Sequence, residues 1–85
     1  MFRKAEQEVM NMAYNYNKLK GAIKEYYGTQ ENFAAHLGIS TAALSARLNN
    51  KSKFSQDEIV KACELVHINP EDIASYFFTY KVQKS

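Results

Sequence analysis

Residues 29–50, TQENFAAHLGISTAALSARLNN, constrain the fold more than any other part of this chain. Thr29 is a good N-cap residue, and it precedes a short segment in which Phe33 and Leu37 lie on one apolar side. Gly38 follows, and glycine readily takes the left-handed conformation that ends a helix. This segment therefore predicts a short helix that ends in a tight turn.

A second short helix is expected directly after this turn. Ser40 can cap it, and it should run from Thr41 to Leu48 with Ala43, Leu44 and Leu48 on its apolar side. Helices of this length are marginal in isolation, so both must pack on other helices. Two short helices joined by a tight turn are the outline of a DNA-binding helix-turn-helix.

The outer side of the second helix carries small, polar and non-acidic side chains, which fit a DNA major groove. The candidate base-contacting residues are Thr41, Ala42, Ser45 and Ala46. The candidate phosphate-contacting residues are Gln30, Ser40, Asn49, Lys51 and Lys53. Arg47 lies near the end of the helix, where a phosphate contact is favoured over a guanine contact. Because strong base readers are sparse, DNA shape would supply much of the specificity.

The flanking segments supply the other helices. The first helix is expected to be capped by Asn15 or Asn17 and to end at Gly28. Ser55 can cap a fourth helix, and Asn69-Pro70 predicts the start of a fifth. The expected inward-facing residues of these three helices are Leu19, Ile23, Tyr26 or Tyr27, Ile59, Ala62, Cys63, Val66, Ile73, Ala74 and Phe77. The predicted fold class is therefore all-α, a compact five-helix bundle.

Composition fits one small domain, since the 85 residues are 46% apolar with three Gly and one Pro. The helical domain is expected over residues 15–78, between an N-terminal extension (1–14) and a C-terminal tail (79–85). The single cysteine, Cys63, excludes an internal disulfide and fits a reducing compartment. No apolar run reaches membrane-spanning length and no signal-peptide core is visible, so we expect a cytoplasmic protein without a membrane partner.

Charge is distributed unevenly along the chain. The net charge of +2 does not itself identify a nucleic-acid binder, but no Asp or Glu occurs between Glu31 and Asp57. Arg47, Lys51 and Lys53 lie inside that interval. A locally basic face on a nearly neutral domain is the electrostatic footprint of a DNA-binding surface.

Both terminal segments leave alternatives open. Residues 2–14 continue a heptad spacing of apolar residues, so they would extend the first helix, pair with a partner helix, or form a frayed extension. Phe78, Tyr80 and Val82 alternate with polar residues, which is the period of a strand. This tail would form a dimer contact or fold back over the core.

Catalytic and metal sites are not expected. His36 and His67 lie far apart, with no second Cys or acidic pair at ligand spacing. Cys63 lies on an apolar helix side and is expected to be buried. No glycine-rich phosphate loop or nucleophile elbow is present. We therefore expect no enzyme activity, no metal and no cofactor.

Residues 17–78 resemble a phage Cro/repressor-type helix-turn-helix domain of the XRE class. The resemblance rests on Gly28-Thr29-Gln30, Phe33-Ala34, Leu37-Gly38-Ile39-Ser40, Leu44, Leu48 and Asn49-Asn50-Lys51. More narrowly, LKGAIKEYYGTQENFA, LNNKSKFSQDEI and YFF resemble small early-region proteins of phages and prophages in Gram-positive bacteria, which include Cro-like regulators and modulators of repression. The resemblance implies a lambda repressor-like DNA-binding domain and DNA contacts by Gln30, Ser40, Thr41, Ala42, Ser45 and Asn49.

Two functions follow from this resemblance. The favoured one is a transcriptional regulator or repressor that binds double-stranded operator DNA of a phage switch as a homodimer. The alternative is a protein-interaction module, a modulator of repression that binds the phage repressor and alters its DNA occupancy. Recognition helices of the family often open with Arg, Lys or Gln, whereas Thr41, Ala42 and Ala43 are short and neutral, which leaves room for the alternative. Either function would be exercised in the cytoplasm of a bacterial host cell.

Overall fold

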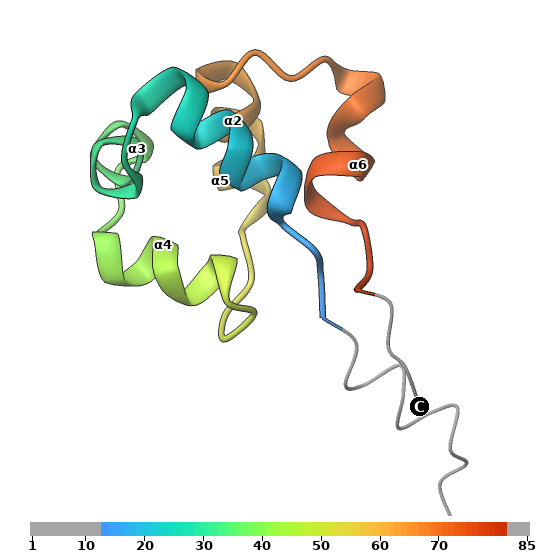
Figure 1. Ribbon diagram of the computed structural model, residues 1–85, viewed down its shortest axis with the longest axis horizontal. Coiled ribbons are helices and arrows are strands. Elements are labelled where there is room, and N and C mark those ends of the chain that lie inside the picture. The colour runs from blue at the N-terminus through green and yellow to red at the C-terminus, as the bar shows by residue number, and fades with distance from the viewer. Residues whose placement is uncertain (1–12, 82–85) are drawn as a thin grey trace, which may run out of the picture.

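The computed structural model describes residues 13–81, so the predictions for residues 1–12 and for Val82 lie outside the described range. Five α-helices and one 3-10 turn follow one another within it (Figure 1). They are α2 (Asn17–Tyr27), α3 (Gln30–Leu37), α4 (Thr41–Leu48), α5 (Gln56–Leu65), η1 (Pro70–Asp72) and α6 (Ile73–Phe77). Within the described residues, β-structure is limited to one isolated β-bridge, so the predicted all-α fold is confirmed.

The α3–turn–α4 unit forms as its local sequence predicts. Thr29 Oγ1 accepts a hydrogen bond from the Asn32 backbone N–H at 3.1 Å, and Ser40 Oγ accepts one from the Ala43 N–H at 3.0 Å. Each cap satisfies a backbone donor that a helix start leaves without a partner. Gly38 ends α3 in the left-handed conformation with φ at 87°, where a side chain would be strained.

The core lies where α3 meets its neighbours, because α3 packs against α2, α4 and α5 and α6 closes over α2. The fully buried large side chains are Phe33, Phe77, Leu19, Ile23 and Leu44. Smaller contributions come from Tyr16, Ala22, Ala34, Leu37, Leu48, Ala62, Cys63, Val66 and Ile68. Every helix therefore contributes apolar side chains to a single cluster.

The start of α2 differs from the prediction. Tyr16 occupies the N-cap position and makes no side-chain capping bond. Asn15 contributes instead from one residue earlier, because its Oδ1 accepts from the Asn17 backbone N–H at 2.8 Å. Residues 13–16 are not helical, so the alternative in which residues 2–14 extend the first helix is wrong for residues 13 and 14, the part of it that is described.

Three predictions of burial need correction or refinement. Tyr27, and not Tyr26, faces inward, since Tyr26 is 48% exposed. Ala74 was expected inside but is exposed, because the 3-10 turn η1 precedes α6 and changes the rotation of the residues that follow. Phe54 was not among the expected inward-facing residues, but it packs against the core with its ring edge-on to that of Tyr16 and 5.5 Å between the ring centres.

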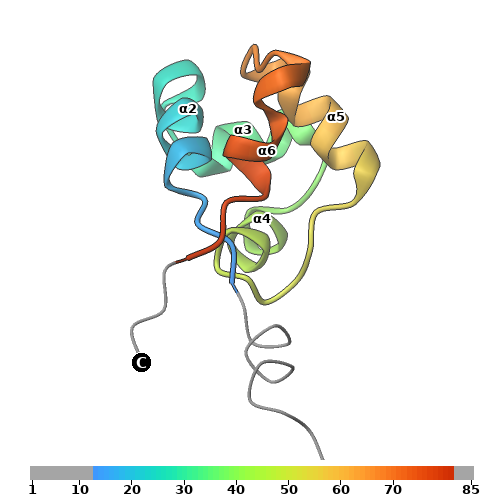
Figure 2. The same ribbon diagram turned by 90° about the vertical axis from the view of Figure 1, so that its right-hand side faces the viewer.

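The two ends of the described chain lie side by side and leave the helical body together (Figures 1 and 2). The Asn15 N–H donates to the Thr79 carbonyl at 2.6 Å, and the Lys81 N–H donates to the Ala13 carbonyl at 2.9 Å. These bonds form an antiparallel bridge between Tyr14 and Tyr80. The strand-like tail therefore pairs with the N-terminal segment of its own chain.

Asn50 connects this terminal pair to the end of α4. Its Oδ1 accepts from the Tyr14 backbone N–H at 2.8 Å, and its Nδ2 donates to the Tyr14 carbonyl at 3.0 Å. Asn50 has a φ of 64°, a left-handed conformation that Asn tolerates better than most residues. One side chain thus fixes both the turn after α4 and the position of residue 14.

Candidate functional site

The outer face of α4 presents the side chains that were expected to read DNA bases. Thr41 and Ala42 are exposed at the start of the helix, whereas Ser45 and Ala46 are half-buried. The Asn49 amide donates to Ser45 Oγ at 3.2 Å, so these two polar groups are paired with each other. The most accessible side chains on this face are therefore short and uncharged.

The expected phosphate contacts are spread over three places. Ser40 is exposed but its hydroxyl is used as a helix cap, and Gln30 is the exposed first residue of α3. Lys51 and Lys53 are exposed in the loop between α4 and α5. The Lys53 ammonium lies 5.8 Å from the centre of the Tyr14 ring, a cation–π distance.

Arg47 is held by protein groups within the fold. Its Nε and Nη2 donate to the two carboxylate oxygens of Glu58 at 2.7 and 3.0 Å, and its Nη1 donates to the Ala43 carbonyl at 3.0 Å. Glu58 Oε1 also accepts from the Ser55 N–H at 3.1 Å, which completes the capping box of α5. The guanidinium therefore joins α4 to α5, and a contact with DNA would compete with this ion pair.

The Arg47–Glu58 pair predicts a pH-dependent contribution to stability. Partial burial raises the pKa of Glu58, but the hydrogen bonds from Arg47 and Ser55 outweigh burial and lower that pKa below its ordinary value of 4.5. A lowered folded-state pKa adds stability above pH 4.5 that is lost as the pH falls through the lowered value. Glu58→Gln should lower the free energy of unfolding by about 1 kcal/mol at pH 7, and by less at pH 3.

Urea denaturation of the wild type and Glu58→Gln at both pH values measures this effect. Asp57→Asn is the matched control, because it removes an equal charge from the same helical turn without touching Arg47. An equal deficit of Glu58→Gln at both pH values would show that the lost charge is not responsible.

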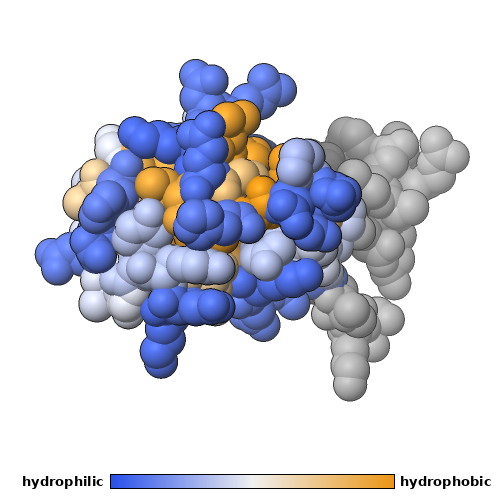
Figure 3. Space-filling model, turned by 90° about the horizontal axis from the view of Figure 1, so that it is seen from above, coloured by the Kyte–Doolittle hydropathy of each residue, from blue (hydrophilic) through white to orange (hydrophobic). Residues whose placement is uncertain are grey.

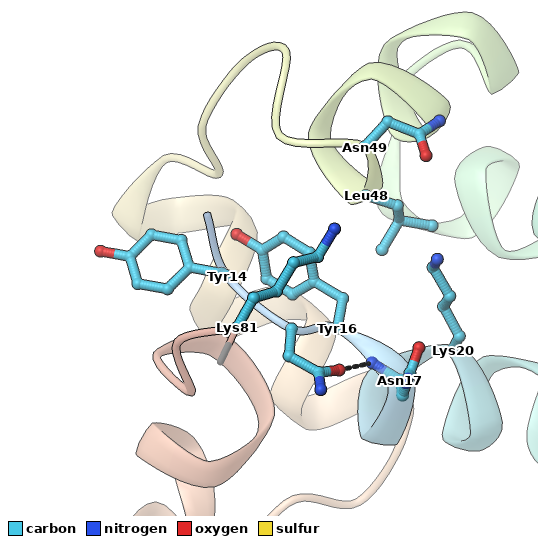
Figure 4. A pocket seen from close by; sticks show the side chains of 8 residues that line it. Tyr14, Tyr16, Asn17, Lys20, Leu48, Asn49 and Lys81 are labelled. Atoms are coloured by element: carbon cyan, nitrogen blue, oxygen red, sulfur yellow. Dashed lines mark hydrogen bonds between the residues drawn. The ribbon is translucent and has the colours of Figure 1, made fainter. Parts of the chain in front are cut away.

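A second feature is a cleft of about 390 Å³ between the end of α4, the start of α2 and the C-terminal segment (Figure 4). Its lining residues are Tyr14, Asn15, Tyr16, Asn17, Lys20, Leu48, Asn49 and Lys81. The ammonium groups of Lys20 and Lys81 both point into the space below Leu48 and Asn49 (Figure 4). We call this the Lys20–Lys81 cleft.

Of these cleft residues, Asn49 was predicted from the sequence to have a binding role. The other charged and amide groups come from segments that are distant from Asn49 in the sequence. Lys20 has the sequence context of an ordinary solvated helix residue. Their approach depends on the pairing of the chain ends and on the Asn50–Tyr14 bonds. No local sequence signal points to that arrangement.

Exposed aromatic side chains gather around Tyr14, which is one of the cleft residues. Phe78 is 47% exposed and Tyr80 is 51% exposed, and their rings lie 5.9 and 5.1 Å from the Tyr14 ring. Elsewhere on the surface, the face seen from above carries apolar side chains in its middle and hydrophilic ones around them (Figure 3). Exposed apolar surface of this kind is common at protein-binding sites.

The residues considered for other chemistry lie apart from both features. Cys63 is buried, and burial, followed by the charge of Glu64, raises the pKa of its thiol, which disfavours the reactive thiolate. His67 is exposed with its ring 5.0 Å from Tyr26. Between residues 13 and 81, no three His, Cys, Asp or Glu side chains are placed to hold a metal ion. The helices described there are too short or too polar to cross a membrane.

Comparison with known proteins places this small helical protein in a family. Residues 12–80 match the family described as "Protein of unknown function (DUF739)", and the chain belongs to that family. A solved structure that it resembles is the modulator of repression (MOR) of the temperate bacteriophage TP901-1 from Lactococcus lactis. The two share 46% sequence identity with a TM-score of 0.69, over 76% of this chain and 88% of the other. No curated protein matches the chain.

The resemblance is high enough to define the class of protein, a small phage regulatory protein. It agrees with the narrower of the two resemblances drawn from the sequence, the one to early-region phage proteins. It favours the modulator alternative over the operator-binding regulator.

Proposed function

We propose that this chain is a modulator of phage repression, a protein-interaction module that binds the phage repressor and alters its occupancy of operator DNA. The observation that carries the proposal is the 46% identity with the TP901-1 modulator of repression over 88% of that chain. On this proposal the protein acts in the cytoplasm of the bacterial host, where repressor and operator are found, and it has no catalytic role.

The described side chains support a protein partner in two ways. On α4, the one long cationic side chain, Arg47, is bound to Glu58, and the exposed Thr41 and Ala42 are weak base readers. At the paired chain ends, Phe78 and Tyr80 expose about half of their surface. Aromatic residues are enriched at protein interfaces, whereas a DNA-binding surface is mainly cationic.

Isothermal titration of the purified chain into the repressor encoded by the same phage or prophage tests the proposal. We expect saturable binding with a defined stoichiometry, and a co-eluting complex in size-exclusion chromatography. Absence of both at micromolar protein concentrations would overturn the proposal.

Direct operator binding is the second candidate, and the α3–turn–α4 unit favours it. Both helices are capped as in a helix-turn-helix, and Gln30, Ser40, Thr41 and Ala42 are exposed. A regulator of this kind would bind as a dimer to half-sites about one helical turn of DNA apart. Direct operator binding requires that the chain alone gives a discrete gel shift, and Gln30→Ala should weaken that shift.

A further inference from the structure

Two lysine side chains enter the Lys20–Lys81 cleft from different segments. Lys20 comes from the first turns of α2 and Lys81 from the C-terminal segment, and both ammonium groups point into the same space (Figure 4). Among residues 13–81, no carboxylate lines the cleft and no ion pair includes either lysine. The cleft therefore concentrates positive charge that the described fold does not neutralise.

The neighbouring Lys18, in contrast, has a structural role. The Lys18 ammonium donates to Ser75 Oγ at 3.2 Å and lies 4.8 Å from the centre of the Tyr76 ring, so it ties α2 to α6. Lys20 has no comparable contact in the described chain, although it is only two residues away. Holding two like charges in one cleft costs free energy unless an anion shares the space.

The remaining lining fits an anion carried on a carbon chain. Asn15, Asn17 and Asn49 supply amides, and Leu48 supplies apolar contact. The volume of about 390 Å³ is far larger than one water or ion requires, since a water molecule occupies about 30 Å³. An acidic side chain with part of its backbone matches both the size and the mixed chemistry.

We propose that the Lys20–Lys81 cleft binds an acidic segment of a protein partner, with an Asp or Glu carboxylate between the two ammonium groups. This inference rests on the proposed function, and it makes the cleft one of the sites at which the chain contacts the repressor. The exposed rings of Phe78 and Tyr80 contact the ring of Tyr14, whose residue also lines the cleft, so an acidic segment followed by apolar residues would contact both features.

Titration of the full chain with tetraglutamate at low salt, followed by NMR of the backbone amides, tests the site without the repressor. We expect saturable shifts at Asn15, Asn17, Lys20, Asn49 and Lys81. The double variant Lys20→Gln/Lys81→Gln should bind at least about tenfold more weakly, which corresponds to about 1.4 kcal/mol. Lys24→Gln is the matched control, since Lys24 is an exposed lysine of the same helix outside the cleft.

Three outcomes of this titration would overturn the inference. Shifts spread evenly over all exposed lysines would show non-specific charge attraction. Equal affinity of the double variant and wild type would place the peptide elsewhere. Tighter binding of inorganic phosphate than of tetraglutamate, at matched ionic strength, would assign the cleft to phosphate and therefore to nucleic acid.

Titration of the repressor separates this inference from the proposed function. If the wild type binds the repressor and Lys20→Glu/Lys81→Glu binds at least about tenfold more weakly, both stand. If both proteins bind equally, the cleft inference fails and the proposed function stands. If the wild type does not bind, the proposed function fails, and with it the assignment of the cleft to a repressor segment.

Discussion

Replacing Phe33 by alanine should lower the free energy of unfolding by about 3–5 kcal/mol. Phe33 is 0% exposed, its ring lies 5.4 Å from that of Tyr27, and its helix contacts three others. The truncated side chain leaves a cavity at the centre of the fold, where no single helix can move to fill it. Domains of this size are typically stable by about 5–15 kcal/mol, so a large part of the stability would be lost.

Urea denaturation monitored by circular dichroism measures this loss. Val60→Ala is the control on α5, because Val60 is 58% exposed and should change the free energy of unfolding by less than about 0.5 kcal/mol. A Phe33→Ala protein within about 1 kcal/mol of wild type would contradict the central position of α3.

The second large effect is expected at Asn50, although this residue is neither apolar nor fully buried. Asn50→Ala removes two hydrogen bonds to the Tyr14 backbone and places alanine at a φ of 64°. Each bond contributes about 0.5–1.5 kcal/mol, and the left-handed conformation costs alanine about 1–2 kcal/mol. We expect a combined loss of about 2–5 kcal/mol.

Asn50→Gly separates the two causes, because glycine tolerates the positive φ but cannot make the side-chain bonds. It should lose about 1–3 kcal/mol, less than the alanine variant. If glycine and alanine were equally destabilising, the backbone conformation would contribute nothing. If neither variant lost stability, the connection between α4 and the chain ends would not be important for folding.

The elements predicted correctly are those specified by neighbouring residues. Thr29, Ser40 and Ser55 each cap a helix through a bond to a residue three positions ahead, so the cap and its partner lie within one stretch of sequence. Gly38 ends α3 for an equally local reason, its freedom to take a positive φ. These signals are sufficient to predict the α3–turn–α4 unit and the all-α fold.

The errors arise where distant segments decide the structure. Phe54 has polar neighbours in the sequence, but in the fold its ring packs against Tyr16 and Phe77, which come from other parts of the chain. Arg47 was predicted to contact DNA, but the fold places its Nε 2.7 Å from a carboxylate oxygen of Glu58. The Lys20–Lys81 cleft likewise exists because the two chain ends pair with each other. Long-range contacts of this kind leave no periodic pattern in the sequence.

The most direct test of the account is a gel-shift titration on labelled operator DNA with the repressor and this chain, separately and together. We expect the chain alone to give no discrete shift, and its addition to a repressor–operator complex to change the fraction of DNA bound. A discrete shift by the chain alone, abolished by Gln30→Ala, together with an unchanged repressor–operator complex, would contradict the modulator account and establish direct operator binding.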